Sequence, residues 1–175
     1  MRKIVFPTLL IFGAILAGCR GGLIESPAPR ALAVLQPTGG SGVSGEIVFG
    51  VAGSKVRVVA EIRGLTPGAH GFHIHENGDC GAADGSSAGG HFNPSGRSHG
   101  NPDLSEHHVG DMPQLIADVN GNARLTAYLD GVQLGEGAGN IIGRSIVVHA
   151  GADDFKTQPA GNSGARLACG VISLK

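Results

Sequence analysis

The sequence predicts an all-β domain, an antiparallel sandwich or barrel of eight short strands. Three observations support this prediction. Apolar and polar residues alternate with a period of two in several short runs, as they do in half-buried strands. Glycine accounts for 31 of the 175 residues, well above its usual share of about 7%, which is typical of a chain with many turns and long loops. No segment shows a convincing helical pattern.

The predicted strands cover most of the chain. The cleanest alternation is in residues 55–62, where every second residue is apolar. Residues 115–119 and 123–129 flank Asn120-Gly121, a strong signal for a tight hairpin turn, so we expect these two runs to pair. The complete set of predicted strands is 31–35, 43–49, 55–62, a short segment around His73, 115–119, 123–129, 145–149 and 167–174.

Composition narrows the classes of function. A chain of 175 residues with 41% apolar residues suits one domain with one core. Aromatic residues make up only 4%, tryptophan is absent and the net charge is −1. A surface that stacks bases or binds phosphates broadly is therefore not expected, which argues against nucleic acid as a partner. No apolar run of the roughly 18 residues that span a membrane lies outside the N-terminus.

The N-terminus has the features of an export signal. Arg2 and Lys3 precede a mostly apolar run, residues 4–16, and then Leu16-Ala17-Gly18-Cys19. These last four residues resemble the lipobox of bacterial lipoproteins, in which the cysteine becomes the lipid-bearing first residue. The alternative is an ordinary signal peptide with a chance cysteine near its cleavage site. We expect a signal peptide over 1–18, a flexible tether over 19–30 and the folded domain over 31–175, exported to the bacterial cell envelope and attached to the membrane through lipid on Cys19.

The cysteine count agrees with export. An odd number of cysteines in an exported chain calls for an explanation, and lipidation of Cys19 leaves Cys80 and Cys169 as a pair. We expect a disulfide between these two, since the envelope is oxidising. Two separate buried thiols are the alternative.

The segment from about 77 to 112 has almost no apolar periodicity. A loop of this length in a compact domain is usually functional or disordered. This one carries Cys80 and four histidines, so we expect a disulfide and bound metal to order it.

The histidines are the main functional signal. His73 and His75 stand two residues apart on a predicted strand, so their rings leave the same face and can reach one metal ion. His108 and Asp111 stand three apart around a glycine, and His149 ends a strand. Each pattern is weak alone, but together they predict a metal centre on a β scaffold. The eight histidines are His70, His73, His75, His91, His99, His107, His108 and His149.

Several motifs in order carry a resemblance to one family. They are Gly71-Phe72-His73-Ile74-His75-Glu76, residues 88–94 (AGGHFNP), His108-Val109-Gly110-Asp111, residues 141–144 (IIGR), residues 147–149 followed by 152–154, and residues 161–170 (GNSGARLACG). From about residue 31 to residue 175 the sequence resembles copper/zinc superoxide dismutases. The resemblance implies an eight-stranded Greek-key fold with long metal-binding and disulfide loops.

The resemblance also implies two metal sites that share one ligand. His91 would bridge copper and zinc as an imidazolate, and Asp153 would accept hydrogen bonds from His73 and His99, orienting both rings. The implied copper ligands are His73, His75, His91 and His149, and the implied zinc ligands are His91, His99, His108 and Asp111.

The implied reaction is the dismutation of superoxide to dioxygen and hydrogen peroxide. Copper would cycle between two oxidation states, His91 would release copper and carry a proton, and zinc would be structural. Arg166 would attract and orient the superoxide anion, with Lys156 as a weaker candidate for longer-range guidance. A homodimer is one assembly to test. The alternatives are a non-enzymatic envelope protein that buffers copper or zinc, and a structural sandwich that binds zinc alone.

Other polar residues are expected to have local roles. His70 and Arg144 are expected to support local structure, and His107 to be a solvated surface residue. Glu76, Asp79 and Asp84 are expected to be solvated or to bond within loops. Compared with animal members of the family, Cys80 lies farther from His91 and the segment 154–166 is short, so a different loop path is expected.

Overall fold

The computed structural model describes residues 30–104 and 106–175. The predicted signal peptide, most of the tether and Cys19 therefore lie outside the described residues. Within the described part, ten strands are joined by long loops and one 3-10 turn, η1 (Ser86–Ala88). The strands are β1 (Arg30–Pro37), β2 (Ser44–Ala52), β3 (Lys55–Arg63), β4 (Gly68–His70), β5 (Phe72–His75), β6 (Leu115–Ala117), β7 (Ala123–Leu129), β8 (Ser145–His149), β9 (Arg166–Val171) and β10 (Ser173–Leu174).

The strands form a single antiparallel sheet that almost closes on itself. Its order is β4-β6-β7-β3-β2-β1-β9-β8-β5, with β10 on β1. The two strands at the ends of this path, β4 and β5, are consecutive in the chain and separated only by Gly71. The connections from β3 to β4 and from β7 to β8 join strands that are not neighbours in this order, as in a Greek key. The predicted all-β antiparallel fold is confirmed.

Alternation of side chains builds the core inside this barrel. In β3, Val56, Val58, Ala60 and Ile62 are buried while the charged residues between them are exposed. The same period brings the inward residues of the other strands together, since each strand presents one face to the interior. The largest fully buried apolar side chains are Phe49, Phe72, Leu35, Ile47, Ile74, Met112, Leu115, Ile141, Ile146 and Ile172.

Three predicted elements differ in detail. The short strand expected around His73 is β5, and a further strand that was not predicted, β4, ends just before Gly71 and pairs with a different neighbour. The C-terminal run is divided into β9 and β10. The predicted hairpin exists, but its turn spans 118–122 rather than two residues, because the Asp118 carboxylate accepts hydrogen bonds from the backbone of Asn120 and Asn122. A short polar side chain thus shortens β6 and lengthens the turn.

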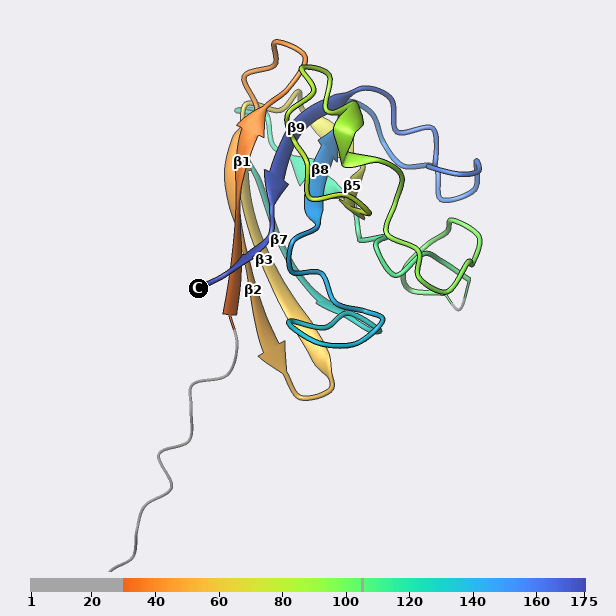
Figure 1. Ribbon diagram of the computed structural model, residues 1–175. Coiled ribbons are helices and arrows are strands. Elements are labelled where there is room, and N and C mark those ends of the chain that lie inside the picture. The colour runs from red at the N-terminus through yellow and green to blue at the C-terminus, as the bar shows by residue number, and fades with distance from the viewer. Residues whose placement is uncertain (1–29, 105) are drawn as a thin grey trace, which may run out of the picture.

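The loops that carry the histidines gather on one side of the barrel (Figure 1). The segment between β5 and β6 contains η1, and the segment between β8 and β9 lies next to it. The first is tied to β9 by the Cys80–Cys169 disulfide. Among the described residues, no helix is long and apolar enough to cross a membrane.

Candidate metal centre

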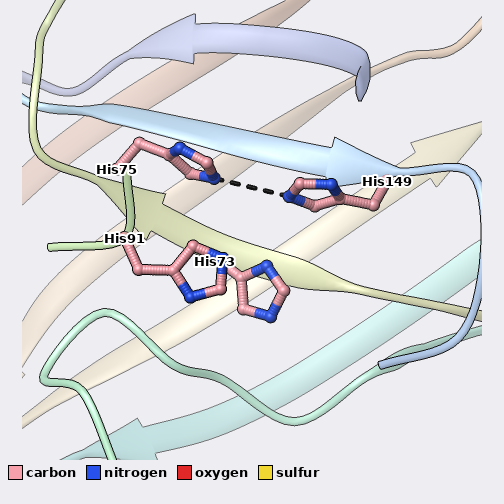
Figure 2. Close-up of side chains that lie close together, drawn as sticks. All are labelled: His73, His75, His91 and His149. Carbon is pink, nitrogen blue, oxygen red and sulfur yellow. Dashed lines mark hydrogen bonds between the residues drawn. The ribbon is translucent and has the colours of Figure 1, made fainter. Parts of the chain in front are cut away.

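Two paired strands present the first histidines. His73 and His75 lie on β5, which pairs with β8 along Phe72–His75, and their ring centroids are 6.4 Å apart. His149 is the last residue of β8, and its backbone N–H donates to the carbonyl of Gly71 just before β5. Because the end of β8 lies next to the start of β5, His149 lies beside His73 and His75, the two histidines predicted to share one face (Figure 2).

The long loop reaches these strands by docking on the free edge of β5. The backbone N–H of Ile74 donates to the carbonyl of Gly110 at 2.9 Å, and that of Phe92 donates to the carbonyl of Ile74 at 2.8 Å. This docking sets His91 opposite His75 and Asp111 opposite His73. A Cβ at position 110 would overlap the carbonyl of Ile74, so glycine is required for the close approach. The backbone of β5 thus assembles the site.

One group consists of four buried imidazoles: His73, His75, His91 and His149, whose candidate ligand atoms all lie within 4.8 Å of one another. Nε2 of His75 and Nε2 of His149 face each other at 3.4 Å (Figure 2). The other ring nitrogen of each faces a carbonyl, Gly89 at 2.9 Å and Gly164 at 3.3 Å. When Nδ1 of each ring donates to its carbonyl, two Nε2 lone pairs point at one place, an arrangement that a cation stabilises.

A second group is centred on Asp111. One carboxylate oxygen, Oδ1, lies 2.9, 3.0 and 3.3 Å from Nδ1 of His91, His99 and His108. The other oxygen, Oδ2, accepts hydrogen bonds from the backbone N–H groups of Gly100 and His108. These two bonds hold the carboxylate so that Oδ1 and the three ring nitrogens face one another and could all contact a single metal ion. Three nitrogens and one oxygen are a typical ligand set for tetrahedral zinc.

Buried nitrogens without partners provide a test of whether metal ions fit. Among the described residues, His73 Nδ1 and His91 Nε2 are buried and have no hydrogen-bond partner. His99 Nδ1 is also buried and makes no hydrogen bond, although it lies 3.0 Å from Asp111 Oδ1. An unsatisfied buried polar atom costs about 1–3 kcal/mol, and a metal ion in each ligand group would satisfy these nitrogens. The first two nitrogens belong to the imidazole group and the third to the Asp111 group. The residues present therefore fit two cations, one in each group.

Electrostatics keeps three of these rings in the neutral form that binds metals. Burial, with the neighbouring imidazoles, lowers the pKa of His149 to about 3 and that of His75 well below its usual value. Burial also lowers the pKa of His91 to about 4, although Asp111 opposes the shift. Neutral imidazole has a free lone pair, so these three rings are ready to act as ligands near neutral pH.

His99 behaves in the opposite way. Burial works against its charged form, but the carboxylates of Asp111 and Asp153 outweigh burial and raise its pKa to about 9. The same contacts hold the pKa values of Asp111 and Asp153 well below their usual range, despite burial. The two carboxylates favour positive charge at this point, which a divalent cation supplies.

Asp153 lies between the two groups. Its Oδ2 accepts a hydrogen bond from His73 Nε2 at 2.6 Å, and its Oδ1 accepts one from His99 Nε2 at 2.9 Å. Both bonds orient the opposite nitrogen, Nδ1, toward a candidate metal position. The contacts are those expected from the sequence resemblance, and they connect one ring of each group through a single buried side chain.

Arg166 lies beside the imidazole group. It is the first residue of β9 and is paired with His149 next to an irregularity in the ladder. Its guanidinium donates to the carbonyls of Gly85 and Gly89, both at 2.6 Å. With His75, His91 and His149 it lines a cavity of about 530 Å³. The pocket therefore joins a fixed positive charge to the candidate metal ligands.

A disulfide connects the ligand loop to this strand. Cys80 and Cys169 are bonded across 89 positions of sequence, which confirms the predicted pair. Cys169 is fully buried on β9 and packs with Ala88 and Val147. The loop that supplies the carbonyls of Gly85 and Gly89 is thereby held against the strand that carries Arg166.

The remaining predicted residues have local contacts. Both ring nitrogens of His70 face carbonyls, those of His149 and Thr66 at 2.8 Å, and the residue belongs to neither ligand group. The Arg144 guanidinium stacks 3.7 Å from the centroid of Phe92 and donates to the carbonyl of Glu76. Both roles agree with the local structure expected of these residues.

Acidic loop residues also behave as expected, whereas His107 does not. Glu76, Asp79 and Asp84 are exposed or lie in loops and accept bonds from nearby backbone N–H groups. His107 is half-buried rather than solvated, and its Nδ1 donates to the carbonyl of the next residue. Lys156 is exposed and does not line the cavity.

Two glutamines were missed by sequence reasoning. Gln114 accepts a hydrogen bond from the backbone of Asp153 at 3.0 Å, and Gln158 exchanges hydrogen bonds with the backbone of His99. A glutamine far along the chain carries no local pattern that indicates such a contact. Only the approach of the two loops reveals it.

Comparisons with known proteins agree with this geometry. The profile of the family described as copper/zinc superoxide dismutase matches residues 43–172. The chain is 41% identical to the extracellular copper–zinc superoxide dismutase of Onchocerca volvulus, over 87% of this chain and 80% of that protein. It is 44% identical to the copper–zinc superoxide dismutase of Schizosaccharomyces pombe, over 83% and 97% of the two chains. It is also 44% identical to copper–zinc superoxide dismutase 2 of Aquifex aeolicus, over 68% and 72%.

A match over most of the described chain thus coincides with two ligand groups that meet at His91. On both grounds, the chain belongs to the copper/zinc superoxide dismutase family.

Proposed function

We propose that this protein is an exported superoxide dismutase that uses copper and zinc. It converts two superoxide anions and two protons into one dioxygen and one hydrogen peroxide. The observation that carries the proposal is the junction of the two ligand groups. His91 belongs to both, its two ring nitrogens face different groups, and the imidazole group lines a cavity with a fixed guanidinium.

The bound metals and the residues of the chain have different roles in the reaction. Copper bound by His73, His75, His91 and His149 supplies the one-electron redox chemistry, and zinc bound by His91, His99, His108 and Asp111 supplies a fixed charge without redox change. His91 would take up a proton from solvent at Nε2 as the first superoxide is oxidised to dioxygen. It delivers this proton as the second superoxide is reduced, and solvent provides the other proton of hydrogen peroxide.

Arg166 guides the anion. Its guanidinium stays charged at every relevant pH, and the carbonyls of Gly85 and Gly89 fix its position. A positive charge on the wall of a partly desolvated cavity attracts a small anion more strongly than it would in bulk water. Arg166 therefore raises the occupancy of the cavity by superoxide and orients it toward the imidazole group.

Two alternatives would use the same ligands without catalysis. A protein that buffers copper or zinc, or a structural domain with zinc alone, needs neither the cavity nor Arg166 at its wall. The test is metal analysis and superoxide consumption on one purified sample. Copper and zinc near one equivalent each, with rapid consumption of superoxide, are expected. Full metal content without activity would favour the buffering protein.

Export and lipid attachment are also part of the proposal. The basic and apolar N-terminal pattern, the disulfide and the extracellular relative of Onchocerca volvulus support export. Lipid on Cys19 in the bacterial cell envelope is supported by the four residues that resemble a lipobox. Several acyl chains anchor a protein firmly, whereas one is marginal. Fatty-acid labelling that is lost in Cys19→Ser, together with release of the variant from membranes, is expected; no label in either protein would refute the anchor.

A homodimer is the proposed assembly. Val34, Val171 and Leu174 are 44%, 40% and 57% exposed. They lie on β1, β9 and β10, and β1 pairs with each of the other two strands. An apolar surface shared by neighbouring strands is suited to contact with a second copy. Sedimentation equilibrium is the test, with Val171→Glu expected to shift the protein toward the monomer; a wild-type monomer at all concentrations would contradict the proposal.

A further inference from the structure

Gln158 makes an unusual two-way contact with a candidate zinc ligand. Its Oε1 accepts a hydrogen bond from the backbone N–H of His99 at 2.8 Å, and its Nε2 donates to the carbonyl of His99 at 2.9 Å. The same Nε2 also donates to the carbonyl of Lys156 at 3.2 Å. The side-chain amide thus pairs with the backbone of one residue in the way that a neighbouring strand would.

The contact joins two loops that are far apart in the sequence. His99 belongs to the loop between β5 and β6, outside any strand, and Gln158 belongs to the loop between β8 and β9. Buried backbone groups need hydrogen-bond partners, and a loop residue has no ladder to supply them. Gln158 supplies both partners for His99, and it comes from the same loop as Asp153, which holds the His99 ring.

Two contacts from one loop therefore define the position of His99. Asp153 fixes the ring through Nε2, and Gln158 fixes the main chain on which the ring is mounted. With both in place, Nδ1 is held toward Asp111 at 3.0 Å. A ligand that is held before the metal arrives loses less freedom on binding.

We propose that Gln158 is a positioning residue for zinc, which it retains in the site by holding the backbone of His99. The inference rests on the proposed zinc site. It distinguishes the two metals, because His99 belongs only to the Asp111 group. Loss of Gln158 should therefore weaken zinc binding and leave copper binding nearly unchanged. Gln158 is itself exposed, so replacing it leaves the core intact.

The test compares Gln158→Met with a matched control. Methionine has a similar length and shape but makes no such hydrogen bonds. Asn93→Leu is the control, since Asn93 pairs in the same two-way manner with the backbone of Arg97, which is a ligand of neither metal. Zinc affinity is measured by chelator competition on metal-free protein, and copper affinity on zinc-saturated protein. Cobalt in the zinc site reports the ligand geometry through its visible absorption bands.

Gln158→Met should bind zinc about tenfold more weakly, the lower end of the range for residues that orient metal ligands. Its cobalt bands should shift, its copper affinity should stay within about twofold of wild type, and Asn93→Leu should match wild type in each measurement. Unchanged zinc affinity would overturn the proposal. Equal loss of both metals, or equal loss in the two variants, would also overturn it, because Gln158 would then support only the fold. Failure of wild type to bind zinc would refute the zinc site itself.

Discussion

Arg166 illustrates how one side chain can have a structural and a functional role at once. Two carbonyls of the disulfide loop accept hydrogen bonds from its guanidinium, as in a purely structural arginine. The backbone carbonyl of Arg166 in turn accepts a hydrogen bond from the Thr38 hydroxyl at 2.7 Å. These bonds use only two of the five N–H groups, and the residue still lines the cavity. The structural bonds therefore hold the charge in place for the anion.

Replacing Arg166 with isoleucine should lower superoxide turnover by roughly ten- to a hundredfold, equivalent to ~1.4–3 kcal/mol. Copper and zinc content should stay near wild type, because no ligand is removed. Arg57→Ile on the exposed side of β3 makes the same change in net charge away from the cavity. It should retain turnover. Added salt should slow wild type more than Arg166→Ile. Full activity of Arg166→Ile at low ionic strength would show that Arg166 is structural.

Asp153 provides a second test on the scale of one residue. Asparagine has a single acceptor oxygen, so Asp153→Asn can satisfy only one of the ring N–H groups of His73 and His99. Its amide N–H₂ would then face the other. Affinity for copper, zinc or both should fall by roughly 10- to 100-fold in chelator competition. The neighbouring Asp154→Asn changes an exposed carboxylate that bonds to residues 156 and 157, and it should bind both metals normally. Equal affinities in the two variants would contradict the role of Asp153.

On the scale of elements, the centre depends on two loops held against one strand edge. β5 receives the first loop through the backbone bonds of Ile74, and the second loop follows directly from β8, the partner of β5. The two loops then meet at Asp153 and Gln158. Since the chain packs closely at these meeting points, small residues are needed there. Gly161 is one of them: a Cβ would overlap the Asp153 carboxylate and approach the His99 ring.

Gly161→Ala should therefore weaken zinc binding and lower the free energy of unfolding. Its φ of +62° also strains any residue with a Cβ. Gly40→Ala separates the two effects, because Gly40 has a φ of +76° but open space around its Cβ position. The control should lose about 1 kcal/mol of stability from backbone strain and keep its zinc. Chemical unfolding and zinc analysis of both variants are the measurements; equal zinc content in the two would show that the overlap is relieved by movement.

On the scale of the whole molecule, the barrel and the loops are stabilised in different ways. The barrel has one continuous apolar core, whose residues come from all parts of the domain, from Ala31 near its start to Ile172 near its end. The ligand loop adds only a few buried apolar residues, among them Phe92 and Met112, and its order relies on the disulfide, the docking on β5 and the buried polar cluster. The charge balance of that cluster makes the stability of the metal-free protein depend on pH.

The free energy of unfolding of the metal-free protein should be greatest near pH 6.5. The pKa values of His91 and His149 fall from 6.5 to about 4 and about 3 on folding, so the unfolded chain binds more protons below pH 6.5 and stability is lost as pH falls. His99 is raised to about 9, so its contribution is complete below pH 6.5 and is lost as pH rises toward 9.

Urea unfolding of the metal-free, disulfide-intact protein between pH 4 and pH 9 is the measurement. Asp111 and Asp153, whose pKa values are lowered, add to the loss at the acid end. A stability that rises steadily toward acid would show that the imidazoles are accessible to protons in the folded chain.

Local patterns were enough to predict most of the fold and several of the candidate ligands. Alternation in residues 55–62 and the apolar run 145–149 predicted β3 and β8, because side-chain period and burial are set by neighbours along the chain. The His73–His75 spacing predicted a shared metal-facing side for the same reason. The resemblance to known sequences added the partners that spacing cannot connect, including Asp153.

Other features depended on contacts between distant segments. The pairing of β4 with β6, the docking of the ligand loop on Ile74 and the pairing of Gln158 with His99 all join residues that no local pattern relates. The two carbonyls that hold Arg166 belong to the same class. The alternation of apolar and polar residues determines which side chains of a strand face the core. The backbone groups that a loop contacts depend instead on how the strands of the barrel pair, which no local pattern specifies.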